Sequence, residues 1–122
     1  MARILVIDDA PDLALVLRMQ LERAGHEVIT AENGRRGLRR FYEVRPDLVV
    51  LDVRMPELDG WETLERLRDL SEVPVVMHTG TTPDRAQLAR LRPEQDGFIQ
   101  KPARAPELTA LVESLLVGHV PA

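Results

Sequence analysis

The amino-acid sequence predicts an α/β domain with a doubly wound parallel sheet of five strands and five helices. Two observations indicate this class. Short apolar runs alternate five times with stretches whose apolar residues recur at helical spacing. Glycine or proline marks several of the boundaries, at Gly25, Pro46 and Gly118. Strands that alternate with helices form right-handed βαβ units, which give a parallel sheet covered on both faces.

The first half of the chain supplies two strands and two helices. Residues 3–8 (RILVID) are a largely apolar run that predicts a buried strand, and residues 27–31 (EVITA) predict the second. The helix between them ends at Gly25. Its helically spaced apolar residues are Leu13, Val16, Leu17, Met19, Leu21 and Ala24. A second helix follows Asn33-Gly34 and ends before Pro46, with an inward side made by Leu38, Phe41 and Val44.

The second half continues the alternation three times. Residues 48–52 (LVVLD) are the most continuous β-branched run and predict the third strand, which a loop over 53–60 follows. The fourth and fifth strands are expected at 74–79 and 97–101. The apolar residues of the three helices are Trp61, Leu64, Leu67 and Leu70; then Ala86, Leu88, Ala89 and Leu91; then Leu108, Leu111, Val112, Leu115 and Leu116. The fourth helix, over 83–91, has the weakest apolar face, and the fifth begins near Pro106, a favourable first-turn proline.

Length and composition favour one cytoplasmic domain without disulfides. We expect residues 1–118 to form it, with 119–122 as a C-terminal tail or the start of a linker. The 122 residues are 44% hydrophobic and 30% charged, with no cysteine. No apolar run approaches the roughly 20 residues that span a membrane, and the first strand begins too early for a signal peptide. A formal net charge of −4 argues against direct binding of nucleic acid.

Polar residues end four of the five predicted strands. By analogy, five βα units in this length match a flavodoxin-like sheet of strand order 2-1-3-4-5, whose ligands bind where the order reverses, between strands one and three. Strand one ends in Asp8-Asp9, strand three in Asp52, strand four in Thr79 and strand five in Lys101. These side chains therefore converge on one crevice.

The three carboxylates of the predicted crevice would repel one another without a cation. Two carboxylates ~4 Å apart repel by about 4 kcal/mol at an effective dielectric constant near 20. A hard divalent ion, Mg²⁺ or Mn²⁺, would neutralise three of them and support phosphoryl transfer to one. Lys101 is the only lysine beside fifteen arginines, which suggests a place for a compact charge that arginine would overfill.

The sequence resembles, over nearly its whole length, the CheY-like receiver domains of two-component response regulators. The matching motifs are Asp8-Asp9 after ILVI, Leu51-Asp52-Val53-Arg54-Met55-Pro56 with Asp59-Gly60, Thr79 after PVVMH, and Lys101-Pro102. The resemblance implies that Asp52 accepts a phosphoryl group from a histidine kinase or histidine phosphotransfer protein.

The resemblance also assigns the neighbouring residues. It implies that Asp8, Asp9 and Asp52 hold Mg²⁺ with the backbone carbonyl of Arg54. Thr79 and Lys101 would contact the phosphoryl group, and the Lys101-Pro102 peptide would be cis.

The resemblance further implies a switch made by Thr79 and Phe98. It would reshape a face formed by the fourth helix, fifth strand and fifth helix, which binds a downstream protein or a fused output domain, or dimerises on phosphorylation. Phe98 stands where tyrosine is common, and Gly80 follows the threonine in place of alanine. His78 replaces an aliphatic residue and is expected in the core, whereas His26 and His119 are expected on the surface.

Three other functions share parts of this pattern. A haloacid-dehalogenase-like phosphatase also uses a strand-end aspartate with Mg²⁺, but it needs a second aspartate where Arg54 stands, and a cap segment. A flavin-binding electron carrier needs a phosphate loop rich in glycine and hydroxyl groups after strand one. A degenerate receiver would dock without phosphate. The complete residue set favours a switch that catalyses only its own phosphorylation and dephosphorylation.

Overall fold

The computed structural model describes residues 1–55 and 57–118; Pro56, His119 and the expected tail over 119–122 lie outside them. The strands are β1 (Arg3–Ile7), β2 (Glu27–Ala31), β3 (Leu48–Asp52), β4 (Val75–Thr79) and β5 (Gly97–Gln100). The helices are α1 (Pro11–Arg23), α2 (Gly34–Val44), α3 (Gly60–Leu70), α4 (Arg85–Leu88) and α5 (Ala105–Gly118). All strands are parallel in the order β2-β1-β3-β4-β5, which confirms the predicted topology.

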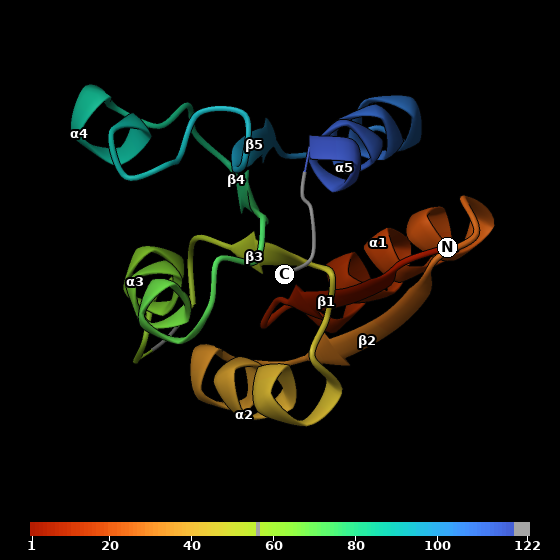
Figure 1. The fold of residues 1–122 in the computed structure, drawn as a ribbon, viewed down its shortest axis with the longest axis horizontal. Helices are drawn as coiled ribbons and strands as arrows, with labels where there is room; N and C mark the ends of the chain where they lie inside the picture. The colour runs from red at the N-terminus through yellow and green to blue at the C-terminus, as the bar shows by residue number, and fades with distance from the viewer. Residues whose placement is uncertain (56, 119–122) are drawn as a thin grey trace.

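Each face of the sheet has its own hydrophobic core, because successive strand residues point to opposite faces. Figure 1 shows α2 and α3 along one face and α1 and α5 along the other. On the first face, strand residues such as Leu51 and Met77 pack with Phe41 and Trp61. On the second face, Val50 and Val76 belong to the cluster that α1 and α5 complete, with Leu17, Leu21, Leu108, Val112 and Leu115. The sheet's centre is therefore packed on both faces, and its strand ends carry the polar groups.

The loop after β3 is shaped by a close approach between α3 and the third strand. The Gly60 amide donates to the Val53 carbonyl at 2.8 Å. A Cβ at Gly60 would lie 2.3 Å from the Asp52 carbonyl oxygen, so only glycine fits there. The Asp59 carboxylate caps α3 by accepting from the Glu62 amide at 2.9 Å. The Asp59-Gly60 pair thus holds α3 against the strand that carries Asp52.

The fourth helix is shorter than predicted. Asp84 and Gln87 form a capping box, but α4 ends at Leu88 and continues only as turns. Ala86, Leu88 and Ala89 are exposed, so the prediction that they provide apolar contacts was wrong; only Leu91 packs on a core cluster. Beyond Leu88 the backbone bonds tighten to turns, with the Arg90 amide donating to the Gln87 carbonyl and the Leu91 amide to the Leu88 carbonyl. The Arg92 amide then donates to the Asp96 carboxylate in place of a helical carbonyl.

His26 is buried, so the prediction that it is a surface residue was wrong. Its Nδ1 accepts from the Ala2 amide at 3.1 Å, and its Nε2 lies 3.0 Å from Glu113 Oε1 on α5. The reason lies in the end of α1, where Gly25 has a φ of 96° and the His26 amide donates back to the Leu21 carbonyl. In this Schellman geometry, the residue after the glycine packs back onto the helix.

None of the described helices is long and apolar enough to cross a membrane.

Candidate functional site

The predicted carboxylates meet at the carboxyl ends of β1 and β3. Asp8 follows β1 directly, Asp9 comes next, and Asp52 is the last residue of β3. One carboxylate oxygen from each lies within 4.8 Å of the other two. Asp8 and Asp52 are both 2% exposed, whereas Asp9 is exposed to solvent. The site is therefore a half-buried carboxylate cluster that opens at Asp9.

The electrostatics of the cluster show a deficit of positive charge. Burial, followed by the charge of Asp52, raises the pKa of Asp8 to about 6, against the Ala10 amide that donates to its Oδ1 at 2.9 Å. The pKa of Asp9 is also raised, by the partial desolvation of its mostly exposed carboxylate and then by Asp52. Asp8 Oδ2 is buried and has no hydrogen-bond partner among the described residues. This partnerless oxygen fits a hard divalent cation, which prefers carboxylate ligands.

Lys101 reaches this cluster from the position directly after β5. Its Nζ donates to Asp52 Oδ1 at 2.6 Å, as the position of the single lysine predicted. Its amide donates to the Thr79 carbonyl at 2.7 Å, which extends the ladder between β4 and β5. The Lys101-Pro102 peptide is cis, which confirms that prediction. The Lys101 ammonium thus pairs with Oδ1 of Asp52 and leaves Oδ2 outside this ion pair.

Thr79 is buried at the end of β4, but its hydroxyl is engaged in its own loop. The hydroxyl donates to the Thr81 carbonyl at 2.6 Å and accepts from the Thr81 amide at 3.1 Å. Phe98 is 37% exposed, with its ring at the surface of β5. Arg54 is exposed, and the role of its backbone carbonyl stays a prediction. The structure therefore brings together four of the predicted groups, Asp8, Asp9, Asp52 and Lys101. The Thr79 hydroxyl is bonded within its own loop, and the Phe98 side chain is exposed.

His78 lies beneath the cluster, which confirms the prediction of a core histidine. It is 2% exposed and is the direct neighbour of Asp52 in the register of β3 and β4. Its Nδ1 lies 4.0 Å from Asp8 Oδ2. Burial, with a smaller contribution from the Lys101 charge, lowers its pKa to about 4. The ring is therefore neutral at physiological pH.

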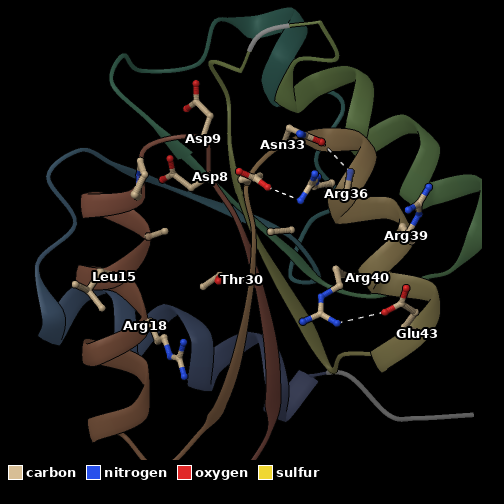
Figure 2. A pocket seen from close by; sticks show the side chains of 14 residues that line it. Asp8, Asp9, Leu15, Arg18, Thr30, Asn33, Arg36, Arg39, Arg40 and Glu43 are labelled. Carbon is tan, nitrogen blue, oxygen red and sulfur yellow. Dashed lines mark hydrogen bonds and ion pairs between the residues drawn. The ribbon is translucent and has the colours of Figure 1, made fainter.

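A groove runs between α1 and α2 over the edge strand β2, with Asp8 and Asp9 at one end (Figure 2). Its charged lining consists of Arg18, Arg36, Arg39 and Arg40 together with Asp8, Asp9, Glu32 and Glu43. Local pairs neutralise much of it, such as Arg36 with Glu32 at 2.6 Å. Four cations and four carboxylates line it, so the groove carries no formal net charge.

Comparison with curated proteins finds relatives among regulators. A probable transcriptional regulator ycf27 from Pyropia yezoensis is 40% identical over 114 residues, covering 93% of this chain and 47% of the relative. The regulatory protein AfsQ1 of Streptomyces coelicolor is 34% identical, covering 95% and 52%. The alkaline phosphatase synthesis regulator PhoP of Bacillus subtilis is 36% identical, covering 93% and 48%. The chain thus spans about half the length of these relatives.

Solved structures that resemble this chain include a chemotaxis protein and a response regulator receiver domain protein. The Vibrio cholerae chemotaxis protein CheY4 superposes with a TM-score of 0.85 at 28% identity, covering 94% of this chain and 98% of that protein. A receiver domain protein from Clostridium thermocellum gives 0.86 at 30% identity, covering 97% and 96%. The dehalogenase-like phosphatase is not supported by these comparisons. The family model of the response regulator receiver domain matches residues 4–113, and this chain belongs to that family.

Proposed function

We propose that residues 1–118 form a phosphorylation switch in which Asp52 accepts a phosphoryl group. Receiver domains take phosphoryl groups from histidine kinases, and the proposed donor is such a kinase or a histidine phosphotransfer protein. The observation that carries the proposal is the position of Asp52. It is buried at the end of β3, one oxygen is bound by Lys101, and carboxylate oxygens of Asp8 and Asp9 lie within 4.8 Å.

The proposed reaction is a displacement at phosphorus. A carboxylate oxygen of Asp52 forms a bond to the phosphorus, and the bond from phosphorus to the donor's leaving group breaks with its electron pair. The leaving group is the imidazole nitrogen of a phosphohistidine or the acetate of acetyl phosphate. The Lys101 ammonium, already 2.6 Å from Asp52, balances charge on the phosphoryl oxygens. Attack by water on phosphorus later releases inorganic phosphate and restores the carboxylate.

The proposed cofactor is Mg²⁺, with Mn²⁺ as a substitute. Receiver domains generally bind Mg²⁺, and here its ligands would come from Asp8, Asp9 and Asp52 and the backbone carbonyl of Arg54. Such an ion supplies charge neutralisation when bound. The residues of this chain fit it because Asp8 presents a buried oxygen without a partner in the described structure. Asp8 itself is oriented by the Ala10 amide.

The proposed output is a change of surface that begins at Thr79. Its hydroxyl, now bonded to Thr81, would turn to a phosphoryl oxygen on Asp52, and Phe98 would follow inward. The face made by α4, β5 and α5 would then bind a downstream protein, a fused output domain or a second copy. An output domain accords with relatives named as transcriptional regulators of which the chain spans about half. We assign the domain to the cytoplasm, in keeping with a chain without cysteine.

Phosphorylation of the intact chain tests this function. Incubation with acetyl phosphate and Mg²⁺ should add the mass of one phosphoryl group to the wild type and none to Asp52→Asn. Asp69→Asn, which changes an exposed carboxylate on α3, should be labelled like the wild type. Excess EDTA should abolish labelling. Labelling of the Asp52→Asn variant at the wild-type rate would place the acceptor elsewhere and refute the proposal.

A further inference from the structure

Two buried polar groups, one in the carboxylate cluster and one beneath it, lie close together without partners. Both ring nitrogens of His78 lack a hydrogen bond among the described residues, and so does Asp8 Oδ2. His78 Nδ1 and Asp8 Oδ2 are 4.0 Å apart, and both side chains are almost fully buried. The two atoms are too far apart for a hydrogen bond and too deeply buried to be hydrogen-bonded by solvent.

A histidine at position 78 should lower the stability of the fold unless its ring nitrogens make an interaction. Its neighbours along β4, Val76 and Met77, are fully buried apolar residues in the two cores. A buried polar group without a partner destabilises a fold, whereas an apolar side chain of similar size does not. The ring nevertheless lies beside Asp52 in the strand register and within a short movement of Asp8. Its polar atoms therefore point to a role at the site above it.

We infer that His78 is a positioning residue, whose Nδ1–H orients the Asp8 carboxylate for a divalent cation. This inference rests on the cation site of the proposed function. The Ala10 amide already fixes Asp8 Oδ1 at 2.9 Å, so a second donor at Oδ2 sets the plane of the carboxylate. A carboxylate oxygen has two lone pairs, so Oδ2 can accept from Nδ1–H and still bind the ion. A shift of about 1 Å brings Nδ1 and Oδ2 into the range of an N–H···O bond. Partners of this kind orient metal-binding groups in proteins and strengthen ion binding.

The charge state of the ring suits a donor of this kind. A neutral imidazole carries one N–H, which it can place on Nδ1. A protonated ring would instead compete with the cation for Asp8 as a second positive charge. Burial and the nearby Lys101 ammonium oppose that form. His78 therefore supports Asp8 without adding charge to the site.

Cation affinity of three His78 variants tests the inference. The readout is the electron paramagnetic resonance signal of free Mn²⁺ during titration of the full chain, followed by competition with Mg²⁺. His78→Val removes both nitrogens and should weaken Mn²⁺ and Mg²⁺ binding roughly tenfold, the lower end for loss of such a partner. His78→Asn places its amide near the position of Nδ1 and should recover most of the affinity. His78→Gln places its amide near Nε2 and should bind as weakly as His78→Val.

Val76→Ala is the matched control for damage to the core. Val76 lies two residues earlier on the same face of β4, in the cluster that α1 and α5 complete. This variant should lower the melting temperature in EDTA and leave Mn²⁺ affinity close to the wild-type value. His78→Val should not lower the melting temperature to the same extent, because it removes unsatisfied polar atoms.

The outcomes separate this inference from the proposed function. A wild type that binds neither Mn²⁺ nor Mg²⁺ would overturn the cation site and the inference together. A wild type that binds both, with His78→Val binding equally well, would overturn only the role of His78. Equal losses in His78→Asn and His78→Val would overturn the assignment to Nδ1. A purely structural role predicts affinity losses in Val76→Ala that match those in His78→Val.

Discussion

Asp8 and Asp96 are two buried carboxylates in one small domain, and their surroundings are opposite. The pKa of Asp8 is raised because burial and Asp52 outweigh its one amide bond. Burial would also raise the pKa of Asp96, but hydrogen bonds from Arg92 and Arg68 outweigh burial and lower it. Asp96 is thus a saturated structural group, whereas Asp8 has spare ligand capacity. This contrast is what distinguishes a binding carboxylate from a structural one.

Lys101 is the residue at which charge and shape can be separated. Lys101→Arg keeps the positive charge but replaces a compact ammonium with a wider planar group beside the buried Asp52. We expect the rate of phosphorylation by acetyl phosphate to fall by at least about tenfold. Complete removal of a stabilising donor typically lowers a rate by about 10²–10³, and the retained charge of arginine should keep the loss smaller than that. Rates from intact-protein mass spectra at several times would measure it. Arg104→Lys, the reverse change at an exposed position, should leave the rate unchanged. Wild-type rates for Lys101→Arg would refute the size argument.

At the scale of elements, the strands and most helices could be predicted because local pattern and tertiary burial agree. The run at 48–52 became β3 with every residue buried. Three strands are one residue shorter than predicted, because Asp8, Pro74 and Lys101 lie just outside β1, β4 and β5 respectively. Carboxyl-terminal strand ends meet at one edge in any parallel sheet of this order, so the Asp8, Asp52 and Lys101 cluster was accessible to sequence reasoning.

Of the features that were not predicted, one involves contacts between distant segments and the others are local. The segment after α4 combines turns at Arg90 and Leu91 with bonds from the Arg92 side chain to backbone carbonyls of Glu72 and Val73, about twenty residues earlier. The apolar pattern of 83–91 does not encode the bonds to that distant segment. His26 was different, because glycine at the end of a helix is a signal that the next residue packs inward. The bonds between Thr79 and Thr81 are local but depend on the loop conformation after β4.

Asp96 connects several elements at the edge of the sheet. Its buried carboxylate accepts from Arg68 Nη2 on α3, from the Val75 amide at 3.0 Å at the start of β4, and from the Arg92 amide at 2.8 Å after α4. It therefore holds α3 and the segment before β5 against the sheet. Arg68 is itself partly buried, and burial lowers its pKa.

Asp96→Asn should destabilise the fold by about 3–5 kcal/mol at pH 7, because it leaves the Arg68 charge uncompensated. The lowered pKa of Asp96 sets the pH dependence. Its stabilisation is present above the ordinary value of 3.8 and is lost as the pH falls through the lower folded-state pKa. Urea unfolding from pH 7 to pH 3 should show a shallower acid decline in Asp96→Asn than in the wild type. The exposed Asp69→Asn is the control, and equal stability of Asp96→Asn and wild type would contradict the assignment.

At the scale of the whole molecule, packing is uneven across the sheet. β1, β3 and β4 are central and covered on both faces, as Figure 1 shows. Toward β5 the cover thins: α4 spans four residues, and none of its described side chains is buried. Leu88 and Phe98 both expose large apolar groups in this region. Segments with few buried contacts open most easily, so this edge is the part of the domain best suited to move.

Amide hydrogen exchange tests whether this edge is the switch. Phosphate on Asp52 gives the Thr79 hydroxyl a charged acceptor that competes with Thr81, which draws the loop over 80–83 inward and frees space for Phe98. Burial of that ring contributes roughly 1.5–3 kcal/mol, enough to shift a two-state equilibrium about tenfold or more. Beryllofluoride with Mg²⁺ stands in for the phosphoryl group and should slow exchange across residues 80–104. Asp52→Asn should show no such change. Protection confined to the loops around Asp9 and Asp52 would leave Phe98 outside the switch and refute this mechanism.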